Sequence, residues 1–155
     1  MAFSKRPRDR IIHGLGLLVA GFASIGMDIG NNRFNGRMID EYHCTKFLND
    51  NMVIRRFYLH ESLIRHNFLV FQTDSGHTFR VHLIAAVTPT DYQPISVVIA
   101  RTYWKPTTKS IGMCDKTARD LKRAVQHQVE QFGTFEVGYN DCRHFARNVA
   151  AFLAS

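Results

Sequence analysis

Cysteine is scarce in this 155-residue sequence, which contains only Cys44, Cys114 and Cys142. No two of them have the Cys-x-x-Cys spacing of a zinc ribbon, and an odd number does not suit a disulfide scaffold. We therefore expect no metal, no cofactor and no disulfide framework. At least one thiol stays free, which fits a reducing compartment and leaves a thiol available as a nucleophile.

Charge of one sign is present in only modest excess, and no internal repeat or low-complexity tract occurs. The chain has 20 Lys and Arg against 13 Asp and Glu, a net charge of +7. Almost half of this excess lies at the start, where Lys5, Arg6, Arg8 and Arg10 face a single Asp9. The remaining charge is ordinary, so no specific nucleic-acid partner is predicted. Length and composition fit one folded domain.

A long hydrophobic run is also lacking. Ile11–Met27 has 17 residues without a formal charge, but it includes His13 and four glycines. A membrane-spanning helix needs about 20 apolar residues. The stretch can be a signal peptide or span, a membrane-lying anchor whose cationic flank meets anionic lipid, or a buried glycine-rich segment. We expect residues 1–30 to form a membrane-associating arm, residues 31–155 a single domain, and the protein to lie at the cytoplasmic face of a membrane.

The middle of the chain has the pattern of β-strands. Residues 28–51 are rich in turn-forming Asn and Gly and read as a connection with one short element near Met38–Phe47. Asp74-Ser-Gly76 predicts a hairpin turn, and Phe68–Phe71, apolar on both faces, predicts a central strand. In the strand after the turn, Phe79, Val81 and Leu83 share one face while Arg80 and His82 share the other. The predicted strands are Val53–Leu59, Ile64–Gln72, Thr78–Ala86 and Ile95–Tyr103.

Helices follow the strands. Apolar residues recur every three or four positions from about Lys116 to Gln131, and Gly133 ends this helix. A second helix begins near Cys142 and runs nearly to Ser155, with Asn140 or Asp141 as its N-cap. Strands followed by helices favour an α+β fold, with an antiparallel sheet packed against helices.

Cys142 is the candidate nucleophile. A cysteine in the first turn of a helix meets the positive end of the helix dipole and unpaired N–H groups, which favour the thiolate and can stabilise an oxyanion. A thiolate also needs a base, and the base an orienting partner. His66 and His82, on adjacent predicted strands, are candidates for these roles, and His60 competes with His66. The other reading makes Cys142 a small core residue.

Three motifs carry a resemblance to a known family: RHNFLVF at 65–71, VHL at 81–83 and NDCRHF at 140–145. They resemble the motifs of the lecithin–retinol acyltransferase-like family, which includes the H-rev-type phospholipase–acyltransferases and some viral proteins. The resemblance covers about Ile64 to Leu153. It implies a circularly permuted papain-like fold in which Cys142 is the nucleophile, His66 the general base and His82 the orienting member.

Three positions depart from the family's pattern. Asp141 stands where the family has Asn, Arg143 where it has Glu, and Asn67 where it has Trp. An aspartate before Cys142 opposes thiol ionisation, whereas an arginine after it favours ionisation. Two hypotheses follow. The first is a thiol-dependent acyltransferase or phospholipase acting on lipid acyl esters through a Cys142 thioester, with a peptide or isopeptide hydrolase as a variant. The second is a catalytically inactive interaction or regulatory protein on the same fold.

Overall fold

The computed structural model describes residues 34–61, 67–85, 94–105 and 111–155. The predicted arm over residues 1–30, with Lys5 to Arg10, lies outside these residues, and so does His66. Within the described residues, no helix is both long enough and apolar enough to cross a membrane. The chain forms β1 (Glu41–Cys44), β2 (Ile54–His60), β3 (Phe68–Thr73), β4 (Thr78–Ala85), β5 (Ile95–Thr102), β6 (Gly112–Met113), α3 (Ala118–Gln131) and α4 (Cys142–Ala154).

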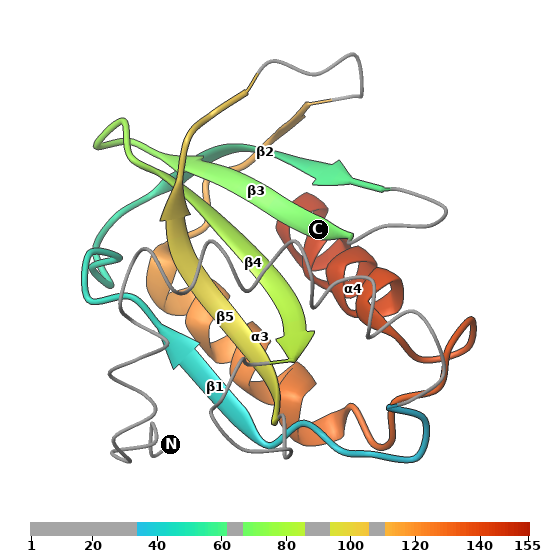
Figure 1. Ribbon diagram of the computed structural model, residues 1–155. Helices are drawn as coiled ribbons and strands as arrows, with labels where there is room; N and C mark the ends of the chain where they lie inside the picture. The colour runs from blue at the N-terminus through green and yellow to red at the C-terminus, as the bar shows by residue number, and fades with distance from the viewer. Residues whose placement is uncertain (1–33, 62–66, 86–93, 106–110) are drawn as a thin grey trace.

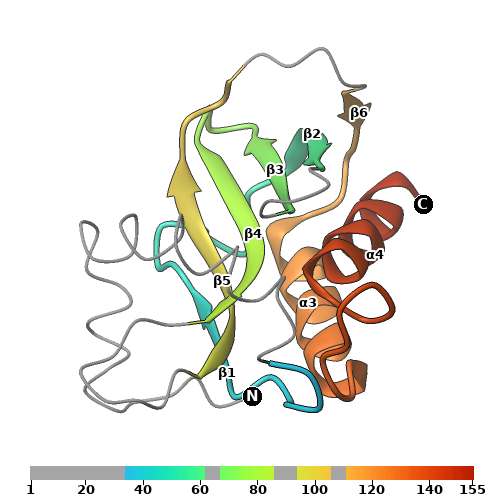
Figure 2. The ribbon, with the colours of Figure 1, turned by 45° about the vertical axis from the view of Figure 1, so that its right-hand side comes forward.

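The strands form one six-stranded sheet in the order β1-β5-β4-β3-β2-β6. Both helices lie on the same side of this sheet (Figures 1 and 2). The predicted α+β class is therefore confirmed. Strands β2 to β5 form an antiparallel meander in which each strand pairs with its neighbour in the chain. Strand β3 lies between β2 and β4, as its apolar pattern predicted, and Gly76 has the positive φ of 85° that the β3–β4 turn requires.

Strand β1 corrects two expectations. The short element expected near Met38–Phe47 is the strand Glu41–Cys44, but it belongs to the sheet and not only to a turn-rich connection. It pairs in parallel with β5, so the sheet is mixed and not antiparallel throughout. Parallel pairing needs a long connection between the two strands, and the three-stranded part of the meander from β2 to β4 supplies it. Turn-forming residues on both sides of this four-residue strand hid its place in the sheet.

The helix boundaries follow the predicted signals. Helix α3 begins after Thr117, whose side chain accepts the N–H of Asp120 while the Asp120 carboxylate accepts the N–H of Thr117. Gly133, with φ 74°, follows the helix end, where its left-handed conformation carries little strain. Helix α4 begins at Cys142, and Asp141, one of the two candidates, is its N-cap.

The two faces of the sheet differ in chemistry. The face that packs against α3 and α4 is apolar, and we call it the helix face; its residues include Leu69, Phe71, Phe79, Val81, Leu83, Val97 and Ile99. Because side chains alternate along a strand, the intervening residues point to the opposite side, which we call the far face. One lateral row of the far face is fixed by the strand register and contains His43, Val98, His82, Phe68 and His60.

Candidate functional site

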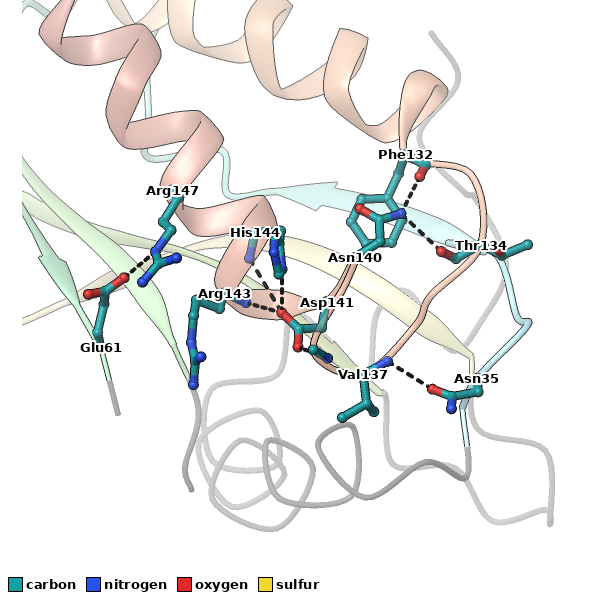
Figure 3. Close-up of polar contacts among 11 residues, drawn as sticks. Asn35, Glu61, Phe132, Thr134, Val137, Asn140, Asp141, Arg143, His144 and Arg147 are labelled. Atoms are coloured by element: carbon teal, nitrogen blue, oxygen red, sulfur yellow. Dashed lines mark hydrogen bonds and ion pairs between the residues drawn. The ribbon is translucent and has the colours of Figure 1, made fainter. Parts of the chain in front are cut away.

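The start of α4 is organised by the carboxylate of Asp141. Its Oδ1 accepts the backbone N–H of Arg143 at 3.1 Å and that of His144 at 3.4 Å, while its Oδ2 accepts the N–H of Gly138 at 2.8 Å (Figure 3). The His144 ring contributes a further contact, Nδ1 to Oδ1, of 2.9 Å. Burial alone would raise the pKa of Asp141, but these hydrogen bonds hold it below its ordinary value. Asp141 is therefore a fixed negative charge beside Cys142.

Asn140, the other candidate N-cap, ties the preceding loop together. Its side-chain amide donates to the carbonyl oxygen of Phe132 at 2.6 Å and to that of Thr134 at 2.9 Å (Figure 3). Both acceptors belong to the segment that leads from α3 towards α4. Asn140 thus positions the turn in front of α4, whereas Asp141 caps the helix itself.

The Cys142 thiol is buried, with 6% of the residue exposed, and lies at the first position of α4. Burial raises the pKa of Cys142, and the Asp141 charge adds to this rise. Hydrogen bonds from Asn67 and the positive charge of Arg143 act in the opposite direction without overcoming it. The sequence left the balance between Asp141 and Arg143 open, and in the structure burial and the Asp141 charge outweigh the groups that favour the thiolate. Desolvation penalises a charged sulfur more than its hydrogen bonds stabilise it.

Asn67 is the residue that sequence reasoning missed. It precedes β3 directly, is only 3% exposed, and hydrogen-bonds the Cys142 sulfur through both its backbone and its side chain. The signal in the sequence that could have identified it is Asn67 itself, at the position where the resembling family has Trp. A polar amide next to an apolar central strand requires a buried partner, and the thiol of α4 is that partner.

His82 is not brought to Cys142. It lies in the middle of β4, fully buried, opposite Phe68 of β3 on the far face. Its ring meets the Phe68 ring edge-on, with centroids 6.2 Å apart, and His60 stacks on the same ring at 4.5 Å. Cys142 belongs to the core on the helix face, so the sheet separates His82 from the thiol. The geometry gives no support to an orienting contact between His82 and a base at Cys142.

His66, the predicted base, precedes Asn67 in the chain but lies outside the described residues. The chain is attached to α4 at both ends of residues 62–66. Arg147 of α4 contacts Glu61 with an Nε–Oε1 distance of 2.5 Å, and Cys142 contacts Asn67 (Figure 3 shows the first pair). The structure thus describes the two residues that flank this segment, and both contact α4.

The described residues contain no group of three or more His, Cys, Asp or Glu side chains arranged to hold a metal ion. His43 and Glu41 form a buried pair with an Nε2–Oε2 distance of 2.8 Å. The neighbouring Cys44 belongs to the helix side of β1, where burial raises its pKa to about 11. His43 and Cys44 point to opposite sides of β1 because they are adjacent in a strand.

Comparison with known proteins adds no relative. No protein-family model, no curated protein sequence and no solved structure matches the chain.

Proposed function

We propose that this protein is a thiol-dependent acyltransferase or hydrolase on a circularly permuted papain-like fold, with Cys142 as the nucleophile and His66 as the base. One observation carries the proposal. The thiol at the first position of α4 is bound by Asn67, the residue that follows His66 in the chain. Nucleophilic catalysis needs a base within hydrogen-bond reach of the thiol, and the contact of Cys142 with Asn67 supports His66, its neighbour in the chain, as that base.

The proposed reaction begins from a neutral thiol. The His66 imidazole takes the Cys142 proton as the sulfur attacks an acyl carbonyl, and the Asn67 donors stabilise the transient negative charge on the sulfur. The tetrahedral intermediate collapses to a thioester, and the leaving alcohol receives the proton from His66. Water, an alcohol or an amine then attacks the thioester and restores the thiol. His82 has no role in this scheme, because it lies on the far face.

Lipid acyl esters are the proposed acyl donors, on the strength of the family resemblance. A peptide or isopeptide bond is the alternative donor, because a cysteine nucleophile and an imidazole base also cleave amides. In both cases the acyl group passes through Cys142, so the same adduct tests both.

The test is a mass-spectrometric search for a thioester on Cys142 after incubation with phospholipid vesicles. Cys142→Ala and Cys142→Ser are expected to lower the rate at least about 100-fold, roughly 2.7 kcal/mol of transition-state stabilisation. His66→Ala should cost about as much, and the double variant little more, because the pair acts as a unit. Cys44→Ser and Cys114→Ser are the matched controls and should retain activity. Absence of an adduct with every ester and amide donor, while Cys142→Ala behaves as wild type in cells, contradicts the proposal.

A non-catalytic interaction protein is the second candidate. Two observations favour it: burial raises the pKa of Cys142, and the predicted orienting residue His82 lies across the sheet from the thiol. Under this reading Cys142 is a core residue whose loss changes stability and not reactivity. A Cys142→Ala variant that binds the same cellular partners as wild type, with no acyl adduct on the wild-type thiol, supports this candidate.

A further inference from the structure

Exposed apolar side chains gather where β5 ends and along β6. Tyr103 is 85% exposed, Met113 75% and Ile111 41%, and these are three of the six large hydrophobic residues exposed in the described part of the chain. We call these three residues, together with Trp104, the β6 tip. Trp104 reaches the strand next to β6, because its ring centroid lies 4.2 Å from the guanidinium of Arg56, the register partner of Met113. The end of β5 and β6 both lie at one end of the molecule (Figure 2).

The exposure of Ile111 and Met113 is built into β6. Gly112 stands between them and packs on β2, where a Cβ atom would lie 2.4 Å from Cζ of Phe57. The Phe57 ring thus occupies the space that a side chain at position 112 would need, and Gly112 takes the inward position of the strand. Alternation then turns the residues on both sides of Gly112 outward. The chain's own β2 therefore does not cover these two side chains.

Four cationic residues lie on the segments that carry or border the tip, while Asp74 of the β3–β4 turn and Asp115 lie beyond them in the chain. Strand β2, residues 94–105 and residues 111–113 carry Arg55, Arg56, Arg101 and Lys105, and they contain no Asp or Glu. Arg55, Arg101 and Lys105 are exposed. An apolar and aromatic tip with a cationic surround complements a surface that is apolar inside and anionic outside. Two copies of the tip would repel each other, which disfavours self-association through it.

We propose that the β6 tip docks on an anionic lipid bilayer, with Tyr103, Ile111 and Met113 at the headgroup boundary and the flanking cations on the headgroups. Tyrosine and tryptophan favour the membrane interface, and basic residues next to it gain attraction from anionic lipid. Single-stranded nucleic acid fits less well, because its bases stack on aromatic rings and make little use of aliphatic side chains such as those of Ile111 and Met113.

This surface does not depend on the chemistry proposed for Cys142. The tip lies at the end of the sheet where β3 turns into β4, whereas Cys142 lies beside Asn67 at the opposite end of β3. Six residues of β3 separate the two ends, about 20 Å of strand.

The sole tryptophan of the chain, Trp104, reports on the tip directly. The full chain is titrated with phosphatidylcholine vesicles, with and without phosphatidylserine, while Trp104 fluorescence is followed. A blue shift on anionic vesicles and quenching by brominated lipid are expected. An unchanged Trp104 spectrum while the protein sediments with the vesicles overturns the proposal, because binding then occurs elsewhere.

Variants separate the tip from the rest of the surface. Tyr103→Ser with Met113→Ser is expected to weaken vesicle binding about tenfold or more. Met38→Ser with Tyr139→Ser is the matched control, because the same residue types are 61% and 84% exposed elsewhere. Arg101→Gln with Lys105→Gln should also weaken binding and reduce its salt dependence. Equal losses in the tip and control pairs, or none in the tip pair, refute the proposal.

Two further measurements distinguish the bilayer from other occupants of the tip, and binding by the tip from binding by the N-terminal arm. The tip pair is repeated in a full chain in which Lys5, Arg6, Arg8 and Arg10 are glutamine, so that residual binding is assigned to the tip. Labelled single-stranded RNA and light scattering are then compared between wild type and the tip pair. If wild type does not bind vesicles, and the tip pair loses RNA binding, the occupant of the tip is RNA and not a bilayer. If wild type does not bind vesicles, and the tip pair loses a dimer, the occupant is a second copy of the chain. A thioester on Cys142 without tip-dependent vesicle binding refutes only the bilayer inference. Tip-dependent vesicle binding without a thioester on Cys142 refutes only the proposed function.

Discussion

Both faces of the sheet are buried at its centre but differ in polarity, because the far face mixes polar residues with apolar ones such as Val70 and Val98. On the helix face, Val81 and Leu83 pack against the core with at most 1% of their surface exposed. On the far face, His43, His82 and Ser96 are fully buried as well. Apolar residues in such positions stabilise the fold by leaving water, whereas polar residues must find partners for their hydrogen-bonding groups. Burial by itself therefore does not distinguish a core position from a functional one.

The comparison also explains why Cys142 and His82, two of the predicted site residues, lie on opposite sides of the sheet. Cys142 approaches the sheet from the helix face, since α4 covers that face. His82 alternates with Val81 and Leu83, so its ring must point to the far face. A polar residue inside an otherwise apolar strand marks the side of the sheet that the helices do not cover. Its proximity to a helix-borne nucleophile depends on which face that helix occupies.

The largest expected effect lies on the helix face. Phe79 is fully buried there and stacks on Phe71 with centroids 5.3 Å apart. Phe79→Ala should lower the free energy of unfolding by about 3–5 kcal/mol, because it removes apolar contacts and leaves a cavity. Chemical denaturation followed by circular dichroism measures the loss. Tyr103→Ala, an exposed aromatic truncation, should cost less than about 0.5 kcal/mol. Similar losses for the two variants would contradict the assignment of the core.

On the far face, the Glu41–His43 pair should show non-additivity. His43→Leu removes one member of a buried pair and should cost about 3 kcal/mol of unfolding free energy. Glu41→Leu with His43→Leu should cost less than His43→Leu alone, because two apolar side chains leave no buried polar group without its partner. Denaturant midpoints of the two single variants and the double variant form the test. Additive losses would show that the two residues do not act as a pair.

The N-cap of α4 should have an intermediate effect that depends on pH. Asp141→Ala is expected to cost about 1–2 kcal/mol at neutral pH. The folded pKa of Asp141 lies below its unfolded value, so its charge stabilises the protein above about pH 4 and this contribution disappears as pH falls through the folded pKa. Wild type and Asp141→Ala should therefore converge at low pH. Asp141→Asn, which can still cap, should lose less than Asp141→Ala; a constant difference across pH would be inconsistent with this account.

The buried thiols should react slowly until the pH is high. Burial raises the pKa of Cys142, and raises that of Cys44 to about 11, so both need more alkaline conditions than the same thiols in denaturant. Because the folded pKa values are raised, the stability these groups contribute is full below about pH 8.5 and is lost as pH rises through the folded values. Iodoacetamide labelling with peptide mass mapping gives the two pH profiles. Rapid labelling of Cys142 near pH 7 would show a thiolate and contradict the structure.

The smallest expected effect is that of His82 on the reactivity of Cys142, where we expect no change. His82→Gln should leave the pH profile of Cys142 alkylation unchanged, because the sheet separates the two residues. Asn67→Ala should move that profile to higher pH, since it removes a donor to the sulfur. Both variants are compared below their unfolding midpoints. A shift with His82→Gln as large as that with Asn67→Ala would restore His82 to the site.

Much of the fold could be read from local patterns. Alternation within residues 78–85, the Asp74–Gly76 turn and the helical period from Ala118 to Val125 each depend on near neighbours in the chain, and each is confirmed. The same alternation already set His82 apart from the apolar face, against the motif resemblance. The pairing of β1 escaped because its partner, β5, lies about 55 residues away (Glu41 pairs with Ser96), and no local pattern encodes a parallel pairing at that distance.

By itself, then, the sequence determined where strands and helices form, which side chains share a face, and that Cys142 opens a helix behind a polar cap. Only the tertiary structure decided which face α4 covers, that Asn67 is the partner of the Cys142 sulfur, and that the thiol is held neutral. Periodicity and capping are local properties, which neighbouring residues impose on each other. Desolvation and buried hydrogen bonds arise between segments distant in the chain, so they come into being only when those segments pack together.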